Sequence, residues 1–132
     1  MVCYYCKQNT AVVNSRFQKR NNSVWRRRRC LSCRQVFTTI EKVDPGNLIM
    51  VESSVGYLEP FERDKLFISI ISCLNHLESP VDTAKSLTDT VISKILLNNS
   101  KSIIKTREIK SIAFASIGRF DSLAAEQYNR SY

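Results

Sequence analysis

The pattern of hydrophobic and polar positions divides the chain into a first part with strand-like stretches and a second part with helical periodicity. Residues 35–40 are rich in β-branched and aromatic residues and predict a strand, and residues 11–13 and 23–29 are two further strand candidates. Residues 17–23 are mostly polar and predict a hairpin tip before the second strand. The first 42 residues are therefore expected to form a small β-sheet.

A turn signal, the sequence DPGN at residues 44–47, separates the two parts. We place a domain boundary at this turn, which gives domains of residues 1–44 and 45–132. Residues 48–52 and 55–59 follow the turn and predict the two strands of a β hairpin.

Apolar residues at helical spacing predict four helices in the remainder of the chain. The first is expected from Pro60 to about residue 75, and the second from a cap at Ser79 to residues 98–99. The third begins at Thr106, and a short fourth helix is capped by Asp121 and reaches the last residue. The predicted fold class is α+β, a small β ribbon followed by a mostly helical domain capped by a β hairpin.

Four of the five cysteines form two C-x-x-C pairs, Cys3 with Cys6 and Cys30 with Cys33, which are 23 residues apart. Two such pairs can close a tetrahedron of thiolates around one Zn²⁺, and a closed site is structural rather than catalytic. Disulfides and buried free thiols are the alternatives. The chain opens without a secretion signal, which favours a reducing cytoplasm and therefore metal over disulfides. We predict one structural Zn²⁺ in a zinc ribbon of three strands, and core packing for Cys73.

Positive charge is concentrated in the first part. Residues 1–42 carry ten basic residues and one acidic residue, whereas residues 43–132 carry ten basic and eleven acidic residues. Such a field attracts a polyanion, and a merely solvated surface is the alternative. The candidate DNA-binding residues are Arg16, Lys19, Arg20, Arg26, Arg27, Arg28 and Arg29. If the last four lie on a strand, alternate side chains face opposite ways. Trp25 could stack on a base or fill the small core, and we favour the core.

The remaining residues argue against several classes of protein. His76 is the only histidine, and it is predicted at the end of a helix, where it would complement the helix dipole, so no catalytic triad or Cys-His pair can be written. The three glycines cannot form a phosphate-binding loop. No run of 18 apolar residues could span a membrane. We therefore predict a non-enzymatic cytoplasmic protein without a membrane partner.

A series of short motifs runs through almost the whole chain. In the first part they are the two cysteine pairs, VNSR at residues 13–16, RRRR before Cys30, and FTTIE at residues 37–41. In the second part they are the strand at residues 48–51, EPFERDKL at 59–66, SPV at 79–81, TREI at 106–109, and FD before a tyrosine-bearing last helix. Together these motifs resemble the NrdR family of bacterial repressors of ribonucleotide reductase genes, in which a zinc ribbon precedes an ATP-cone domain.

The resemblance implies a nucleotide-controlled switch. In such a protein the ATP-cone, residues 45–132, binds ATP or dATP, and the bound nucleotide sets the homo-oligomer that meets double-stranded DNA. By this resemblance Lys65 would contact phosphates, and Val51 and Glu59 would flank the nucleotide. Lys65 could equally be a solvated helix lysine near Glu62.

The ATP-cone part departs from the family's pattern where cations are expected, at residues 52–53 and 78–79 and at Gln127. Each charge-assisted hydrogen bond lost to a triphosphate would cost about 1.5–3 kcal/mol. Three hypotheses therefore stay open. The chain is a DNA-binding repressor that senses adenine nucleotides, a DNA-binding protein whose cone only mediates oligomerisation, or a zinc-ribbon adaptor that binds RNA or the transcription machinery.

Overall fold

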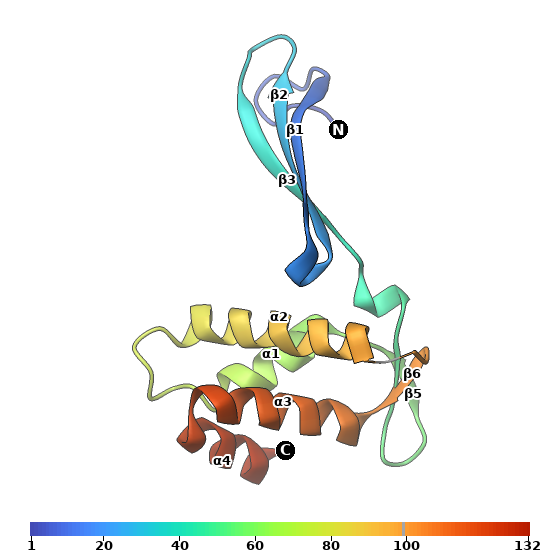
Figure 1. Cartoon of the computed structure of the whole chain (residues 1–132), viewed down its shortest axis with the longest axis vertical. Coiled ribbons are helices and arrows are strands. Elements are labelled where there is room, and N and C mark those ends of the chain that lie inside the picture. The colour runs from blue at the N-terminus through green and yellow to red at the C-terminus, as the bar shows by residue number, and fades with distance from the viewer. Residues whose placement is uncertain (99) are drawn as a thin grey trace. The chain divides into compact units, whose positions relative to one another are not determined.

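The computed structural model describes residues 1–98 and 100–132, which form two compact units, Met1–Val43 and Asp44–Tyr132. Figure 1 shows strands in the first unit and mainly helices in the second. The predicted α+β class is confirmed. Within the described residues, no helix combines the length and the apolar character that crossing a membrane requires.

Unit 1 is a three-stranded antiparallel sheet in the order β1-β2-β3. Its strands are β1 (Thr10–Gln18), β2 (Ser23–Cys30) and β3 (Val36–Lys42). A short 3₁₀ turn, η1 (Lys19–Asn21), joins β1 to β2 inside the predicted hairpin tip. All three strands exceed their predicted lengths, because cross-strand hydrogen bonding extends the ladder into polar residues that have little strand propensity.

Unit 1 has almost no apolar core. The structure describes all of its residues, and only Cys3, Ser23 and Cys30 are buried. Trp25, which we expected to fill a small core, is half-buried between Arg16 on β1 and Ile40 on β3. So little buried apolar surface cannot offset the conformational entropy of ordering the sheet. Unit 1 therefore needs a second source of stability.

Unit 2 combines a small sheet with helices. The sheet has the order β5-β4-β6 and is formed by β4 (Met50–Glu52), β5 (Leu58–Pro60) and β6 (Ile103–Lys105). Strands β4 and β5 form the predicted hairpin, whereas β6 pairs in parallel with β4 and was not predicted. A 3₁₀ turn, η2 (Pro45–Asn47), precedes β4, and the side chain of Asp44 caps it.

The helices of unit 2 are α1 (Arg63–Ile71), α2 (Pro80–Asn98), α3 (Thr106–Phe120) and α4 (Ser122–Ser131). The predicted starts of the second and third helices agree with the structure. The second helix ends at Asn98, and Asn99 lies outside the described residues. The cap of the fourth is confirmed, because a side-chain oxygen of Asp121 accepts from the Ala124 N–H at 2.7 Å.

The first helix is shorter than predicted at both ends. Pro60 is the last residue of β5, where it pairs with Met50, so the helix cannot begin until the chain leaves the sheet. After Ile71 the backbone tightens into turns, in which the N–H groups of Cys73, Leu74 and Leu77 each donate to the carbonyl three residues back. These turns bury Cys73, which confirms its predicted core packing.

His76 does not end a helix, because α1 stops five residues earlier. It lies in the connection between α1 and α2, where its Nε2 is 3.4 Å from Oδ1 of Asp121. The core of unit 2 is formed by side chains from all four helices and from β6. Its fully buried members include Ile70, Leu74, Val91, Ile95, Ala113, Ile117 and Ala124.

Candidate metal centre and nucleic-acid interface

Each cysteine pair lies in a tight turn at the end of the sheet, and the two turns share one hydrogen-bond pattern. The N–H of Cys3 donates to the carbonyl of Gln8 at 2.8 Å, and the N–H of Cys30 donates to the carbonyl of Gln35 at 2.9 Å. In each turn a further amide donates to the sulfur of the first cysteine at 3.4 Å. The chain has thus folded two separate segments into equivalent sulfur-presenting turns.

The residue after each second cysteine has a left-handed backbone. Lys7 has φ 61° and Arg34 has φ 64°. This conformation costs about 1–2 kcal/mol for a residue with a Cβ atom. The same conformation at both positions indicates that the turn geometry, rather than local residue preference, fixes the backbone.

The two turns bring the four sulfurs together. All four sulfur atoms lie within 4.8 Å of one another, with 3.6 Å between Cys3 and Cys33 and 3.4 Å between Cys6 and Cys30. A Zn–S bond of about 2.3 Å in a tetrahedron corresponds to sulfur separations of about 3.8 Å. Four thiolates with this spacing fit Zn²⁺ and would occupy every coordination position, which makes the site structural.

The pKa values of the thiols differ within the cluster. Burial opposes ionisation of Cys30, but backbone N–H groups of its turn, that of Cys33 first, and neighbouring thiols lower its pKa to about 6. The N–H of Cys6 is the main group that lowers the pKa of Cys3. For Cys33, the N–H of Gln35 favours the thiolate, yet burial and the three other thiols raise the pKa to about 12. The four thiolates therefore need a cation to coexist.

Strand β2 begins at the hairpin and ends at the metal centre, and it carries the run of four arginines. Arg27 and Arg29 are exposed, whereas Arg26 and Arg28 are half-buried on the opposite face. The prediction that alternate arginines face opposite ways is confirmed. The other candidates for DNA binding are also exposed, with Arg16 on β1 and with Lys19 and Arg20 in η1.

In unit 2 the three predicted nucleotide-binding residues come together. Val51 on β4 pairs with Glu59 on β5, Lys65 lies on the first turn of α1, and all three line one hollow of about 220 Å³. Further residues that line this hollow were not predicted from the sequence. Lys110 of α3, Tyr128 of α4 and Tyr132, which follows α4, also line it. The sequence placed tyrosines on the last helix but gave no signal for where that helix docks.

The charge of Lys65 is already paired in this structure. Its Nζ lies 2.9 Å from a carboxylate oxygen of Glu59 and 3.2 Å from one of Glu62. Hydrogen bonds to these two groups, that of Glu59 first, raise the pKa of Lys65. Lys65 therefore remains protonated, and a phosphate would compete with two carboxylates for it.

A second hollow, of about 520 Å³, borders the first and shares Thr106 and Lys110 with it. It lies between the β4–β5 hairpin and the start of α3, and Lys105 and Arg107 supply further cations. The hydroxyl of Thr106 donates to the carbonyl of Glu52 at 3.1 Å, which ties α3 to β4.

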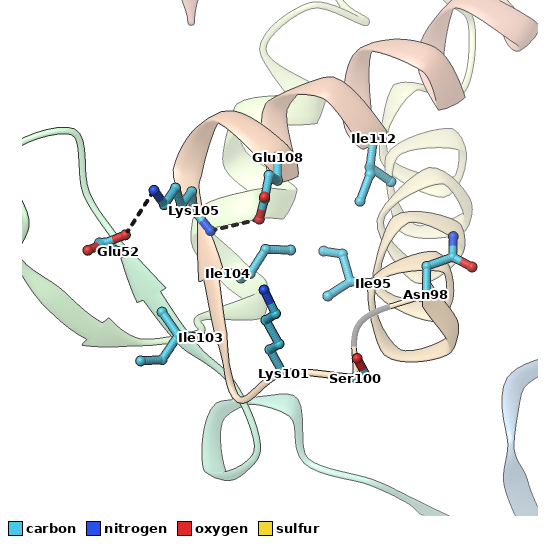
Figure 2. A pocket seen from close by; sticks show the side chains of 10 residues that line it. All are labelled: Glu52, Ile95, Asn98, Ser100, Lys101, Ile103, Ile104, Lys105, Glu108 and Ile112. Atoms are coloured by element: carbon cyan, nitrogen blue, oxygen red, sulfur yellow. Dashed lines mark hydrogen bonds and ion pairs between the residues drawn. The ribbon is translucent and has the colours of Figure 1, made fainter.

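A third hollow, of about 470 Å³, lies between the end of α2, β6 and α3. Figure 2 shows the amine of Lys101 directed toward Ile104 of β6, with Ile95 of α2 across the hollow. Lys105 extends instead toward Glu52, at 3.8 Å, and Glu108 accepts a hydrogen bond from the backbone N–H of Lys105 at 3.1 Å. None of the predicted nucleotide-binding residues lines this hollow.

Several known proteins that are similar to the chain carry the same name. Residues 1–41 match the family model "Transcriptional repressor NrdR-like, N-terminal domain". Proteins named "Transcriptional repressor NrdR" from Alkaliphilus metalliredigens and Alkaliphilus oremlandii are 31% and 30% identical over 133 residues, covering 100% of this chain and 84% and 85% of those proteins. One of the same name from Symbiobacterium thermophilum is 35% identical over 91 residues, which is 69% of this chain and 60% of that protein.

Proposed function

Because the chain belongs to the NrdR family of transcriptional repressors, we propose that it is a zinc-dependent repressor that binds double-stranded DNA through unit 1. Its relatives are named for repression of transcription, which is a non-enzymatic role. Genes for ribonucleotide reductase are the proposed targets, from the resemblance of its motifs to that family. The proposed place of action is the cytoplasm, where bacterial DNA lies.

The observation that carries the DNA-binding proposal is the charge on a metal-stapled sheet. Residues 1–42 hold ten basic residues against Glu41 alone, while the rest of the chain is close to neutral. Four thiolates and one Zn²⁺ would together contribute two negative charges, which leaves unit 1 strongly positive. Arginine is suited to this task because its planar fork binds both phosphates and guanine edges.

Selection from a pool of random 40-base-pair duplexes with the immobilised, zinc-loaded full chain tests this proposal. We expect one shared sequence to be enriched, and we expect a chelator to abolish the enrichment. A fall in affinity with added salt would not by itself show specific DNA binding, because the binding of any polyanion weakens with salt. Tighter binding of single-stranded RNA of the same length, with no enriched duplex, would instead support an adaptor of RNA or the transcription machinery.

We further propose that unit 2 binds ATP or dATP and that the bound nucleotide changes the homo-oligomer. The hollow around Val51, Glu59 and Lys65 supports this, since it has an apolar side, two tyrosines and two lysines. By itself it is smaller than common ligand pockets of about 300–1,000 Å³. The neighbouring hollow, which shares Thr106 and Lys110, would have to take the phosphates.

A cone that only mediates oligomerisation is the second candidate for unit 2. It is favoured by the pairing of Lys65 with two carboxylates and by Glu52 at the edge of the neighbouring hollow. A triphosphate would have to displace Lys65 from these partners and would lie near a third carboxylate. Both features weaken anion binding.

Isothermal titration of the zinc-loaded chain with ATP and with dATP, followed by light scattering, distinguishes the two candidates. Nucleotide sensing predicts micromolar binding and a change in assembly mass. Lys65→Gln should weaken binding, whereas Lys85→Gln, an exposed lysine on α2 that pairs with Asp82, should not. No heat and an unchanged mass in the wild-type protein would leave oligomerisation as the role of the cone.

A further inference from the structure

We propose that the ribbon binds double-stranded DNA with one face of its sheet and that the four consecutive arginines serve two different purposes. Arg27 and Arg29, with Arg16 from β1, contact the DNA. Arg26 and Arg28 stabilise the sheet instead. This inference rests on the proposed DNA-binding function and names the surface that performs it.

The strand register places Arg16, Arg27 and Arg29 on one face of the sheet. Trp25 lies directly opposite Arg16, and Arg27 lies opposite Asn14. Directly opposite residues in an antiparallel sheet point to the same side, and residues two apart on a strand do so as well. Asn14, Arg16, Trp25, Arg27 and Arg29 therefore form one surface, which we call the arginine face.

The arginines of this face are available for a ligand. In the part of the chain that the structure describes, the side chains of Arg16, Arg27 and Arg29 have no hydrogen bond or ion pair. All three are exposed. Binding DNA through them breaks no contact within the protein.

The arginines of the opposite face are committed to the sheet. Nη2 of Arg26 lies 3.0 Å from a carboxylate oxygen of Glu41, and Nη1 of Arg28 donates to the hydroxyl of Thr10 at 3.5 Å. The Nε atoms of both arginines are buried and have no partner, so neither guanidinium can offer its full fork to a phosphate. Arg26 bridges β2 to β3, and Arg28 bridges β2 to β1.

The position of the one acidic side chain also distinguishes the two faces. Glu41 is the only acidic residue of unit 1, and it lies on the opposite face, where it would repel a phosphate. Exposed apolar side chains lie on both faces, with Phe17 60% exposed on the opposite face and Ile40, beside Trp25, 56% exposed on the arginine face, so they do not separate the two. On the arginine face, Asn14 adds an amide that can pair with an adenine edge.

The spacing of the arginine face fits a duplex. Arg27 and Arg29 are about 6.7 Å apart along the strand, and Arg16 extends the row to about 13 Å. The major groove, about 12 Å wide, admits two antiparallel strands, and the arginines of this face lie on two, β1 and β2.

Four single substitutions on the same strand test the inference, each removing one positive charge: Arg26→Gln, Arg27→Gln, Arg28→Gln and Arg29→Gln. The probe is a fluorescein-labelled 30-base-pair duplex of mixed sequence, titrated with the zinc-loaded full chain between 50 and 200 mM KCl. Because the net charge change is the same in all four, differences report contacts rather than the overall field. Thermal unfolding of each variant measures stability separately.

We expect Arg27→Gln and Arg29→Gln to weaken binding by about tenfold and to lower the salt slope by about one each, with unchanged stability. Arg26→Gln and Arg28→Gln should lower the unfolding temperature and leave the salt slope as it is. Where they prevent folding, Glu41→Gln replaces them, because it frees Arg26 without removing a cation. It should lower stability and should not weaken binding.

The assignment of the faces would be overturned if the salt slope of DNA binding fell equally in all four variants. It would also be overturned if the slope fell only in Arg26→Gln and Arg28→Gln. A wild-type protein with no affinity for the duplex would refute the DNA-binding function itself, and the face assignment with it. The two failures are therefore distinguishable, since the first requires binding by the wild-type chain.

Discussion

At the scale of single residues, Asp121 connects the start of α4 to the segment that follows α1. One of its carboxylate oxygens accepts from the Ala124 N–H at 2.7 Å and lies 3.4 Å from Nε2 of His76. The Ala124 N–H lowers the pKa of Asp121 most, and it outweighs the partial burial that would raise it. His76 lowers the pKa further. The fold therefore favours the charged carboxylate.

This shift predicts a pH dependence of stability. Because the pKa of Asp121 is lower in the folded than in the unfolded chain, its contribution is fully present above the unfolded value of about 3.9 and is lost as pH falls through the folded value. Asp121→Ala should lower the free energy of unfolding of unit 2 at pH 7 and should lower it by less at pH 3. Urea unfolding followed by helical circular dichroism measures both.

Asp121→Asn is the matched control, because it keeps an oxygen acceptor for the cap and removes only the charge. Asp121→Asn should lower the free energy of unfolding at pH 7 by less than Asp121→Ala does. If the cost of Asp121→Ala were the same at pH 3 as at pH 7, the carboxylate charge would not be the stabilising feature.

Sequence reasoning at this scale reached the residues whose roles depend on local spacing. The two cysteine pairs were identifiable because four thiols at that spacing have few other uses. The different roles of Arg26 and Arg27 could not be identified from the sequence, because they depend on which residues of β1 and β3 lie beside each arginine. Glu41 pairs with Arg26 and Thr10 bonds to Arg28, and each of these partners lies far from its arginine in the sequence.

At the scale of elements, the start of the third helix, the cap of the fourth and the β4–β5 hairpin were predicted well, whereas strand β6 was not predicted. The helix after Thr106 and the cap at Asp121 carry local signals that the structure confirms. Strand β6 has only three residues, and its pairing with β4 joins segments about fifty residues apart. No local pattern encodes such a pairing, because each strand is stable only in the presence of the other.

Strand β6 predicts a sharp difference between two neighbouring isoleucines. Ile104 is 3% exposed in the core of unit 2, while Ile103 is 45% exposed on the other side of the strand. Ile104→Ala should destabilise unit 2 by about 2–5 kcal/mol through lost burial and the cavity left behind. Ile103→Ala should change stability by about 0.5 kcal/mol or less. Urea unfolding of both variants provides the measurement.

Equal effects from the two substitutions would mean that β6 does not alternate between core and surface as described. That result would also weaken the description of the hollow in Figure 2, because both isoleucines line it. The comparison is internally matched, since residue type, strand and substitution are the same.

At the scale of the whole molecule, the two units obtain stability in different ways. Unit 2 has a continuous apolar core, whereas the buried residues of unit 1 are two cysteines and a serine. A structural Zn²⁺ contributes about 10–16 kcal/mol in small domains, which is enough to make folding conditional on the metal. The same metal would hold the arginine face in register, so DNA binding and metal binding should be lost together.

Removing the metal from the full chain should therefore unfold unit 1 and leave unit 2 folded. A thiol reagent added after a chelator should react quickly with four cysteines, while Cys73, buried in the core of unit 2, reacts only when urea is added. Without a chelator, the four thiolates should be protected by Zn²⁺. Fast reaction of all five thiols would show that the units unfold together. Slow reaction of all five after chelation would show that unit 1 folds without metal, so its stability would need another explanation than Zn²⁺ binding.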